Sequence, residues 1–418
     1  MQYIKLLVIA IAVLGFVYKL ALSIVKYRSA NNPTPENLKD VYDEETYEKW
    51  KKYSAEHCRL DIIMNVVNLV ITVVMLATNV YSAFASLFPK DNFFFQTLAV
   101  IIIEMAVATV VGIVESYIAN MIIEQKYGFN KTSIKTFIFD QLRSLILGFG
   151  LSLGLAMLIA GLHIWLGAWM MLAFAIVVFL FSLFVTFLYP LFSRIGNKFT
   201  PLEDGELKER LLALLNKHGY KVKAIEVMDA SRRTTKVNAY FTGFGKMKTI
   251  VLYDNLLTSM STDEICAIFA HELGHGLHKD VLKSQLLNIV YMLLIGAMAW
   301  GALSLPEFYS EFGFAAGEIN YGFTYILLGI GLSLLQPVTG LVINAVSRSH
   351  EYRADRQAVS EGYGEAMITA FKKLAKDNFA HLAPSKINVV LEYSHPPLDR
   401  RVEEVEKAMA AQSSKDEA

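Results

Sequence analysis

Long apolar segments recur along the chain and define its fold class. They lie near residues 6–25, 62–82, 97–118, 144–160, 167–189, 287–305 and 323–345. A helix that crosses the hydrocarbon core of a bilayer needs about 20 apolar residues. The apolar stretch from Leu145 to Phe192 is too long for one crossing, so Gly161, His163 and Gly167 predict a tight turn between two helices. The pattern therefore predicts a mainly α, polytopic membrane protein with seven transmembrane helices.

The polar connections between these segments differ in charge. The connection from Lys26 to Arg59 holds seven Lys or Arg residues and that from Met121 to Arg143 holds four. The connections between them hold only Lys90. Because basic connections stay in the cytoplasm, we expect the first, third and fifth connections and the C-terminal tail there, with the N-terminus outside. A cleaved signal peptide is the alternative for the first span, but only Lys5 precedes its apolar run, so an uncleaved helix is favoured.

Composition agrees with a membrane protein. The chain is 54% hydrophobic and 19% charged, with no formal net charge. Soluble domains average about a quarter charged residues. Nothing in this balance indicates nucleic acid as a partner.

The sequence HELGH, beginning at His271, has the spacing of a zinc site. Ser261 followed by Glu264 is a capping-box pattern, which predicts a helix that contains the motif. Positions four apart on a helix differ by about 40° and lie about 6 Å apart along its axis, so His271 and His275 can share one metal ion. Glu272 is rotated by about 100° from His271, which suits a general base acting on water beside the metal.

A catalytic zinc site needs a third protein ligand. Val281 stands where a metzincin would have its third histidine, and His278 is about 10 Å along the axis from His271, too far to share the ion. Glu351 and Asp355, four apart in SRSHEYRAD, are better candidates: one as the ligand, the other as the group that orients a histidine ligand.

The alternative for SRSHEYRAD is an ordinary charged helix face that includes Arg353 and Arg356. Topology favours the metal site. The HELGH helix ends shortly before the sixth span and Glu351 follows the seventh, so both lie at the cytoplasmic ends of one helical hairpin. We therefore expect 1–192 to form a membrane region with five helices, and 193–418 to form a zinc metallopeptidase region with helices six and seven and the C-terminal cytoplasmic segment.

The polar stretch from Arg194 to Gln285 predicts a small α+β, gluzincin-like subdomain. The β-branched runs 222–228 and 249–253, with Lys236 to Phe244 between turn-like segments, predict a short antiparallel sheet. An extended peptide can pair with the edge of such a sheet. Asn238 is then a candidate substrate-binding residue, or an ordinary asparagine at the end of a strand.

Several segments resemble one family of membrane proteases. HELGH, SRSHEYRAD, VNAYF, EQKYGFNKTS and SHPPLDRRV look like the type I CAAX prenyl endopeptidases, the seven-helix zinc metalloproteases of membranes. The resemblance runs over nearly the whole chain. Shorter bacterial heat-shock membrane metalloproteases share HExxH and the later glutamate but have fewer helices, and they are the alternative within the fold.

The resemblance implies roles for individual residues. His271, His275 and Glu351 would hold one zinc ion per chain, with Glu272 as the general base. Asp355 would be the partner of a ligand. His395 and Arg401 match a C-terminal pair at the active site, where His395 would donate a hydrogen bond to the oxyanion. The family's helices enclose a water-filled chamber, which would suit the acidic residues Glu104 and Glu115 of the third span.

The resemblance also implies a substrate. Family members remove the last three residues from isoprenylated proteins that end in CaaX. The expected partners are membrane lipid and peptide or protein substrates, and we expect a monomer. The compact chain ends in SKDEA rather than an endoplasmic reticulum signal, which favours a bacterial homologue in the cell membrane acting on misfolded membrane proteins or other peptides. A eukaryotic protein would lie in the endoplasmic reticulum. The alternative from another class is a transporter with a structural zinc site.

Overall fold

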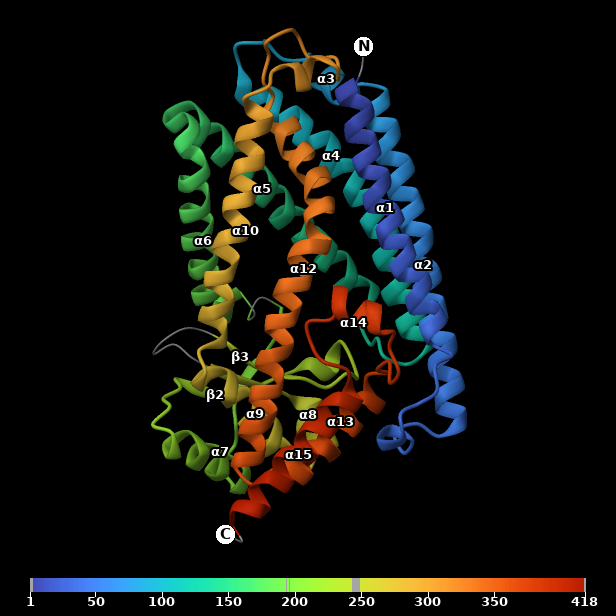
Figure 1. Cartoon of the computed structure of the whole chain (residues 1–418), viewed down its shortest axis with the longest axis vertical. Helices are drawn as coiled ribbons and strands as arrows, with labels where there is room; N and C mark the ends of the chain where they lie inside the picture. The colour runs from blue at the N-terminus through green and yellow to red at the C-terminus, as the bar shows by residue number, and fades with distance from the viewer. Residues whose placement is uncertain (1–2, 193, 195, 243–248, 417–418) are drawn as a thin grey trace.

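Long helices standing side by side dominate the computed structural model, which describes residues 3–192, 194, 196–242 and 249–416. A smaller mixed α/β part lies at one end of them, near the C-terminus, and the N-terminus lies at the opposite end (Figure 1). The long helices are α1 (Tyr3–Ser29), α2 (Glu44–Ala77), α4 (Phe93–Ser116), α5 (Ile134–Leu166), α6 (Met170–Phe192), α10 (Asp280–Leu303) and α12 (Tyr321–Ser360). The short helix α3 (Val80–Ala85) follows α2, and a π-helix (Tyr117–Glu124) continues α4.

Six segments of the described chain are long and apolar enough to cross a membrane. The fourth, Ile134–Leu188, contains both α5 and α6, which are joined by the 3₁₀ turn η3 (Gly167–Trp169). The chain reverses direction at this turn (Figure 1), so the six segments comprise seven long helices. The protein is therefore a multi-pass membrane protein.

The predicted turn between α5 and α6 was placed too early. Gly161 and His163 lie inside α5, and only Gly167, with φ of 52°, belongs to the turn. Nδ1 of His163 lies 3.1 Å from the hydroxyl of Tyr321, at the start of α12. This partner lets a polar residue continue the helix where the sequence alone indicated a break.

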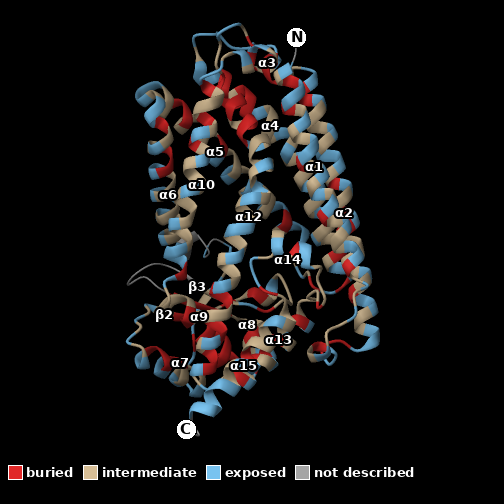
Figure 2. Ribbon diagram, viewed as in Figure 1, coloured by how far each residue is buried: buried red, intermediate tan, exposed pale blue. Residues whose placement is uncertain are grey.

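The surface of the long helices is apolar. Buried residues gather near α3 and around helix α9 (Thr262–Leu277), whereas the middle of the long helices is mostly half-buried or exposed (Figure 2). Exposed side chains there include Ile146, Leu147 and Leu151 of α5. Apolar side chains that face outward over such lengths suit contact with lipid.

The smaller part contains a four-stranded sheet in the order β1-β2-β4-β3. Its strands are β1 (Phe199–Pro201), β2 (Ala224–Met228), β3 (Ala239–Thr242) and β4 (Thr249–Tyr253). The predicted antiparallel sheet is wrong in one respect, because β2 and β4 pair in parallel. The chain after β2 crosses to the far edge as β3 before it returns through β4 between them. Residues 243 and 244 of the expected strand lie outside the described residues.

Helices cover this sheet and enclose a second core. They are α7 (Glu206–Lys217), α8 (Asp254–Ser259), α9 and α13 (Gly364–Asp377). Helices α14 (Lys386–Glu392) and α15 (Leu398–Asp416) pack against α12 instead. The short helices are η1 (Glu36–Leu38), η4 (Ala230–Arg232) and α11 (Glu307–Ser310). Leu211, Ile250 and Phe269 pack together in the core between α7, β4 and α9. Helix α9 is buried along most of its length, which fixes its orientation. The predicted boundary between the two regions falls at residue 193, which lies outside the described residues.

Candidate active site

The helix that contains HELGH begins as its sequence predicts. The hydroxyl of Ser261 accepts a hydrogen bond from the backbone N–H of Glu264, and the Glu264 carboxylate accepts one from the N–H of Ser261. Such a capping box satisfies two backbone donors that the first turn would leave free. Glu264 also accepts a hydrogen bond of 2.7 Å from Lys373 in α13. The start of α9 is therefore fixed both locally and by a neighbouring helix.

Three of the predicted ligand residues meet in space. Donor atoms of His271, His275 and Glu351 lie within 4.8 Å of one another. Nε2 of His271 is 3.7 Å from one Glu351 oxygen, and Nε2 of His275 is 3.4 Å from the other. A Cβ atom at Gly274 would lie only 3.0 Å from the Cα of Ala354, so the glycine permits α9 and α12 to approach closely. Residues 76 positions apart in sequence thus form one cluster.

This donor set fits zinc. Two imidazole nitrogens and one carboxylate oxygen are ligands that catalytic zinc uses, with bonds of about 2.0–2.1 Å. Tetrahedral bonds of that length separate neighbouring donors by about 3.3–3.4 Å. The separations from the histidine nitrogens to the two Glu351 oxygens, 3.4 and 3.7 Å, lie close to this value, within a donor set that spans up to 4.8 Å.

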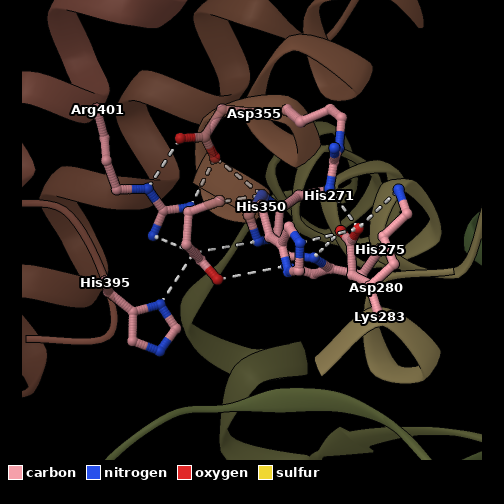
Figure 3. Close-up of polar contacts among 10 residues, drawn as sticks. His271, His275, Asp280, Lys283, His350, Asp355, His395 and Arg401 are labelled. Carbon is pink, nitrogen blue, oxygen red and sulfur yellow. Dashed lines mark hydrogen bonds and ion pairs between the residues drawn. The ribbon is translucent and has the colours of Figure 1, made fainter. Parts of the chain in front are cut away.

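Asp355 contacts His271 on the ring nitrogen that is not in the cluster, and Arg401 contacts Asp355 (Figure 3). Oδ1 of Asp355 is 2.8 Å from Nδ1 of His271, the nitrogen that faces away from the cluster. Arg401 donates to both Asp355 oxygens, from Nε at 2.9 Å and from Nη2 at 2.6 Å. Burial alone would lower the pKa of Arg401, but the charges of Asp355 and Glu351 outweigh it and raise that pKa.

The alternative of an ordinary charged face on α12 is wrong. Glu351 and Asp355 are both buried, and Asp355 is inaccessible to solvent. Of the neighbouring arginines, Arg353 donates to Asp280 beside the cluster, and only Arg356 points away from it, donating to Glu404 in α15.

Asp280 is a site residue that sequence reasoning missed. Its carboxylate lies 3.0 Å from Nδ1 of His275 and also accepts from Arg353 (Figure 3). Helix α9 ends at Leu277, Lys279 adopts a left-handed φ of 56°, and α10 then begins at Asp280. The sequence signal that could have identified Asp280 was a carboxylate just past the HExxH helix.

The two carboxylates also change the acidity of His275. Burial alone would lower the pKa of His275, but Glu351 and Asp280 raise it to about 9.

Of the remaining candidate residues, some lie at the cluster and others lie outside it. Nδ1 of His395 lies 2.9 Å from Glu351, so His395 and Arg401 both reach the cluster, as expected. Glu272 is half-buried beside His271, and its carboxylate forms no hydrogen bond or ion pair with any residue that the structure describes. Asn238 is exposed, and its side chain accepts a hydrogen bond from the N–H of Ala239. His278 is not one of the three grouped donors.

Cavities lie between the long helices. One of about 630 Å³ is lined by Glu104, and one of about 530 Å³ by Glu115. Lys19, Asn65 and Asn68 line both, so the two cavities adjoin. Both acidic residues of the third span therefore face interior cavities.

Comparison with known proteins follows the same division of the chain. The family model "CAAX prenyl protease N-terminal, five membrane helices" matches residues 4–194, and "Peptidase family M48" matches residues 201–409. A cluster of two histidines and a buried glutamate, in a chain with these matches, defines a membrane metalloendopeptidase. The chain belongs to peptidase family M48, in its CAAX prenyl protease group.

Individual relatives are similar over almost their full lengths. CAAX prenyl protease 1 of Saccharomyces cerevisiae is 28% identical over 95% of this chain and 94% of its own. The CAAX prenyl protease 1 homolog of Dictyostelium discoideum is 30% identical, with 90% of each chain covered. The crystal structure of S. mikatae Ste24p superposes with a TM-score of 0.88 at 28% identity, covering 96% of this chain and 99% of Ste24p.

These matches separate the alternatives left open by the sequence. The match over five N-terminal membrane helices favours this group over the shorter heat-shock proteases. The M48 match favours a metallopeptidase over a transporter, and it implies a catalytic metal.

Proposed function

We propose that this protein is a zinc endopeptidase that removes the C-terminal tripeptide from isoprenylated proteins at the cytoplasmic face of its membrane. The observation that supports this most is the convergence of His271, His275 and Glu351 beside Glu272, whose carboxylate pairs with none of the described residues. The relatives that share this chain's full length are named CAAX prenyl proteases, which supports the substrate class.

The proposed roles follow from position. His271, His275 and Glu351 hold one zinc ion, which when bound polarises the scissile carbonyl and acidifies water. Glu272 takes the proton from the attacking water, because its carboxylate lies next to His271 and is not held by another described residue. The same carboxyl group then delivers that proton to the leaving amine.

The surrounding residues orient this machinery. Asp355 and Asp280 accept from Nδ1 of His271 and His275, which leaves Nε2 of each ring free as a ligand. Arg401 neutralises the buried Asp355 carboxylate and holds it in place. His395 is two-thirds exposed, so it faces accessible space where it can donate a hydrogen bond to the developing oxyanion.

The substrate would lie against the edge of the sheet. Strand β3 is an edge strand that contacts α9, and Asn238 directly precedes it. Its main chain and the Asn238 amide would bind an extended peptide without selecting particular side chains. The adjoining cavities have an apolar and a polar portion, which suits a peptide with an attached isoprenoid.

The charge of the connections supports the proposed orientation, with the site in the cytoplasm and the N-terminus outside. The membrane is the endoplasmic reticulum in a eukaryote and the cell membrane in a bacterium. We propose that the chain works as a monomer surrounded by lipid, with 1–192 as the membrane region and 193–418 as the peptidase region.

Purified protein tests the substrate class. A farnesylated CaaX peptide and the same peptide without the farnesyl group are incubated with the enzyme, and products are identified by mass spectrometry. We expect release of the intact aaX tripeptide, faster from the farnesylated peptide. Cleavage at other bonds with no preference for the farnesyl group would contradict the CaaX assignment and favour a broader protease.

A metal analysis tests the ligand set. Glu351→Ala should lower zinc content. Glu361→Ala, a control at the end of the same helix and outside the cluster, should retain it. Full zinc occupancy and activity in Glu351→Ala would overturn the assignment.

A further inference from the structure

One face of α12 holds the segment that carries His395. Residues at intervals of three or four lie on one side of a helix. On α12 such a row comprises Gly340, Asn344, Arg348, Glu351 and Asp355. Each of these residues contacts the C-terminal part of the chain between residues 389 and 401.

Hydrogen bonds, ion pairs and close packing join α12 to this C-terminal segment. A Cβ atom at Gly340 would lie 3.2 Å from the carbonyl oxygen of Leu391, and the Asn344 side chain donates to that same oxygen at 2.8 Å. Arg348 donates from Nη1 to the carbonyl oxygens of Val389 and Tyr393, each at 2.8 Å. One turn further on, Glu351 meets His395, and Asp355 meets Arg401.

His395 needs such support because little else holds it. Its side chain is 66% exposed, and it lies in the connection between α14 and α15. Arg348 is attached to the main chain two residues before His395 and stands three residues before the ligand Glu351. A single helix turn therefore sets the distance between Glu351 and His395.

The geometry points to Arg348 as a positioning residue: it fixes the main chain at Tyr393 so that the His395 imidazole stands at the metal cluster. A guanidinium suits this task because it makes charge-assisted hydrogen bonds to two carbonyl oxygens at once. Asn344 supports the same segment one turn earlier. The inference rests on the proposed function, since it gives His395 its purpose.

The test compares turnover in Arg348→Met, His395→Ala and the double variant. Arg348→Met keeps the length of the side chain but removes its donors. We expect about a 10- to 100-fold fall in kcat with little change in KM, because displacement of a catalytic group by about 1 Å costs up to 100-fold. The double variant should be no slower than His395→Ala alone. Zinc content should stay at the wild-type level, and Arg348→Lys should recover part of the loss.

A control variant and a second measurement separate a displaced His395 from general damage to the fold. Arg356→Met removes another arginine of α12, which pairs with Glu404 on the surface, and it should leave kcat unchanged. Hydrogen exchange of full-length protein in detergent should be faster for residues 386–397 in Arg348→Met, with the exchange of α9 unaltered.

The outcomes are distinct. Wild-type turnover in Arg348→Met, or a double variant slower by the product of both single effects, would overturn the inference. Unchanged exchange of 386–397 would overturn it as well. If His395→Ala keeps full turnover, the catalytic role of His395 fails, and the exchange measurement still decides whether Arg348 holds this segment.

Discussion

The carboxylate of Asp280 lies 3.0 Å from Nδ1 of His275. Asp355 has the same relationship to His271, at 2.8 Å. Each imidazole of the cluster thus has an acidic partner on the nitrogen that faces away from Glu351. Two partners from different helices, α10 and α12, fix the two rings independently.

Removing the Asp280 partner should weaken metal binding. Carboxylates behind a ligating histidine contribute about 10- to 100-fold to metal affinity. Asp280→Ala should therefore raise the Kd for zinc by about that factor, measured by competition with a chelator. Asp263→Ala, an exposed aspartate of α9 paired with Arg210, is the matched control. Equal Kd values for wild type and Asp280→Ala would show that Asp280 does not support the ligand.

Helix contact at Gly274 should also control metal binding. A methyl group there would meet the backbone of Ala354 at 3.0 Å and push α9 away from α12. Gly274→Ala should lower zinc content, because His271 and His275 would move away from Glu351. Gly301→Ala adds a methyl that meets no described atom within 4 Å beyond its own helix backbone and chain neighbours, and this variant should bind zinc normally. Normal zinc affinity in Gly274→Ala would show that the helices need not approach so closely.

Arg401 should stabilise the fold as well as the site. It is the bidentate partner of the solvent-inaccessible Asp355. Because a buried carboxylate without its partner is costly, Arg401→Gln should lower the free energy of unfolding by about 3 kcal/mol. Arg400→Gln removes an exposed arginine that pairs with Glu403 and should cost less than about 1 kcal/mol. Equal losses in the two variants, measured by thermal unfolding in detergent, would contradict this.

His381 should make the protein sensitive to mild acid. The Ser29 hydroxyl donates to the carbonyl of Lys26, so it accepts from Nε2 of His381, and the N–H of Ala383 donates to Nδ1. These contacts require a neutral ring. Burial, helped by the charge of Lys26, lowers the pKa of His381 to about 4.

The direction in which stability changes with pH follows from proton binding at His381. Between pH 6.5 and 4 the unfolded chain binds a proton at His381 that the folded protein does not, so stability falls as the pH falls through this window. The loss should reach about 2 kcal/mol at pH 5. His381→Gln should flatten this part of the curve of unfolding midpoint against pH. A wild-type slope in His381→Gln would assign the acid sensitivity to other groups.

The sequence predicted what depends on local periodicity. The seven long helices follow from the lengths of the apolar segments. The capping box at Ser261 and the pairing of His271 with His275 follow from residue spacing within α9. Topology added Glu351, because a helical hairpin brings its ends together. The spacing of SRSHEYRAD added Asp355 as the carboxylate that orients a histidine. Arg401 needed the family resemblance, since nothing local to it indicates that it reaches another helix.

The errors and omissions have a common cause. His163 continues α5 because Tyr321, far along the chain, provides its partner. Asp280 reaches His275 only through the left-handed turn at Lys279. The parallel pairing of β2 and β4 depends on a crossover that strand patterns do not reveal. Each depends on a tertiary contact or a backbone angle that hydrophobic periodicity does not encode.

Exchange of the Glu272 carboxylate for an amide tests the central claim most directly. Glu272→Gln keeps the shape of the side chain but cannot accept a proton from water, and general base catalysis contributes about 100- to 10,000-fold. Zinc content and turnover of a fluorogenic farnesylated CaaX peptide are measured on the same purified sample. We predict normal zinc content with turnover lowered by about 1,000-fold. Normal zinc content with wild-type turnover would contradict the account.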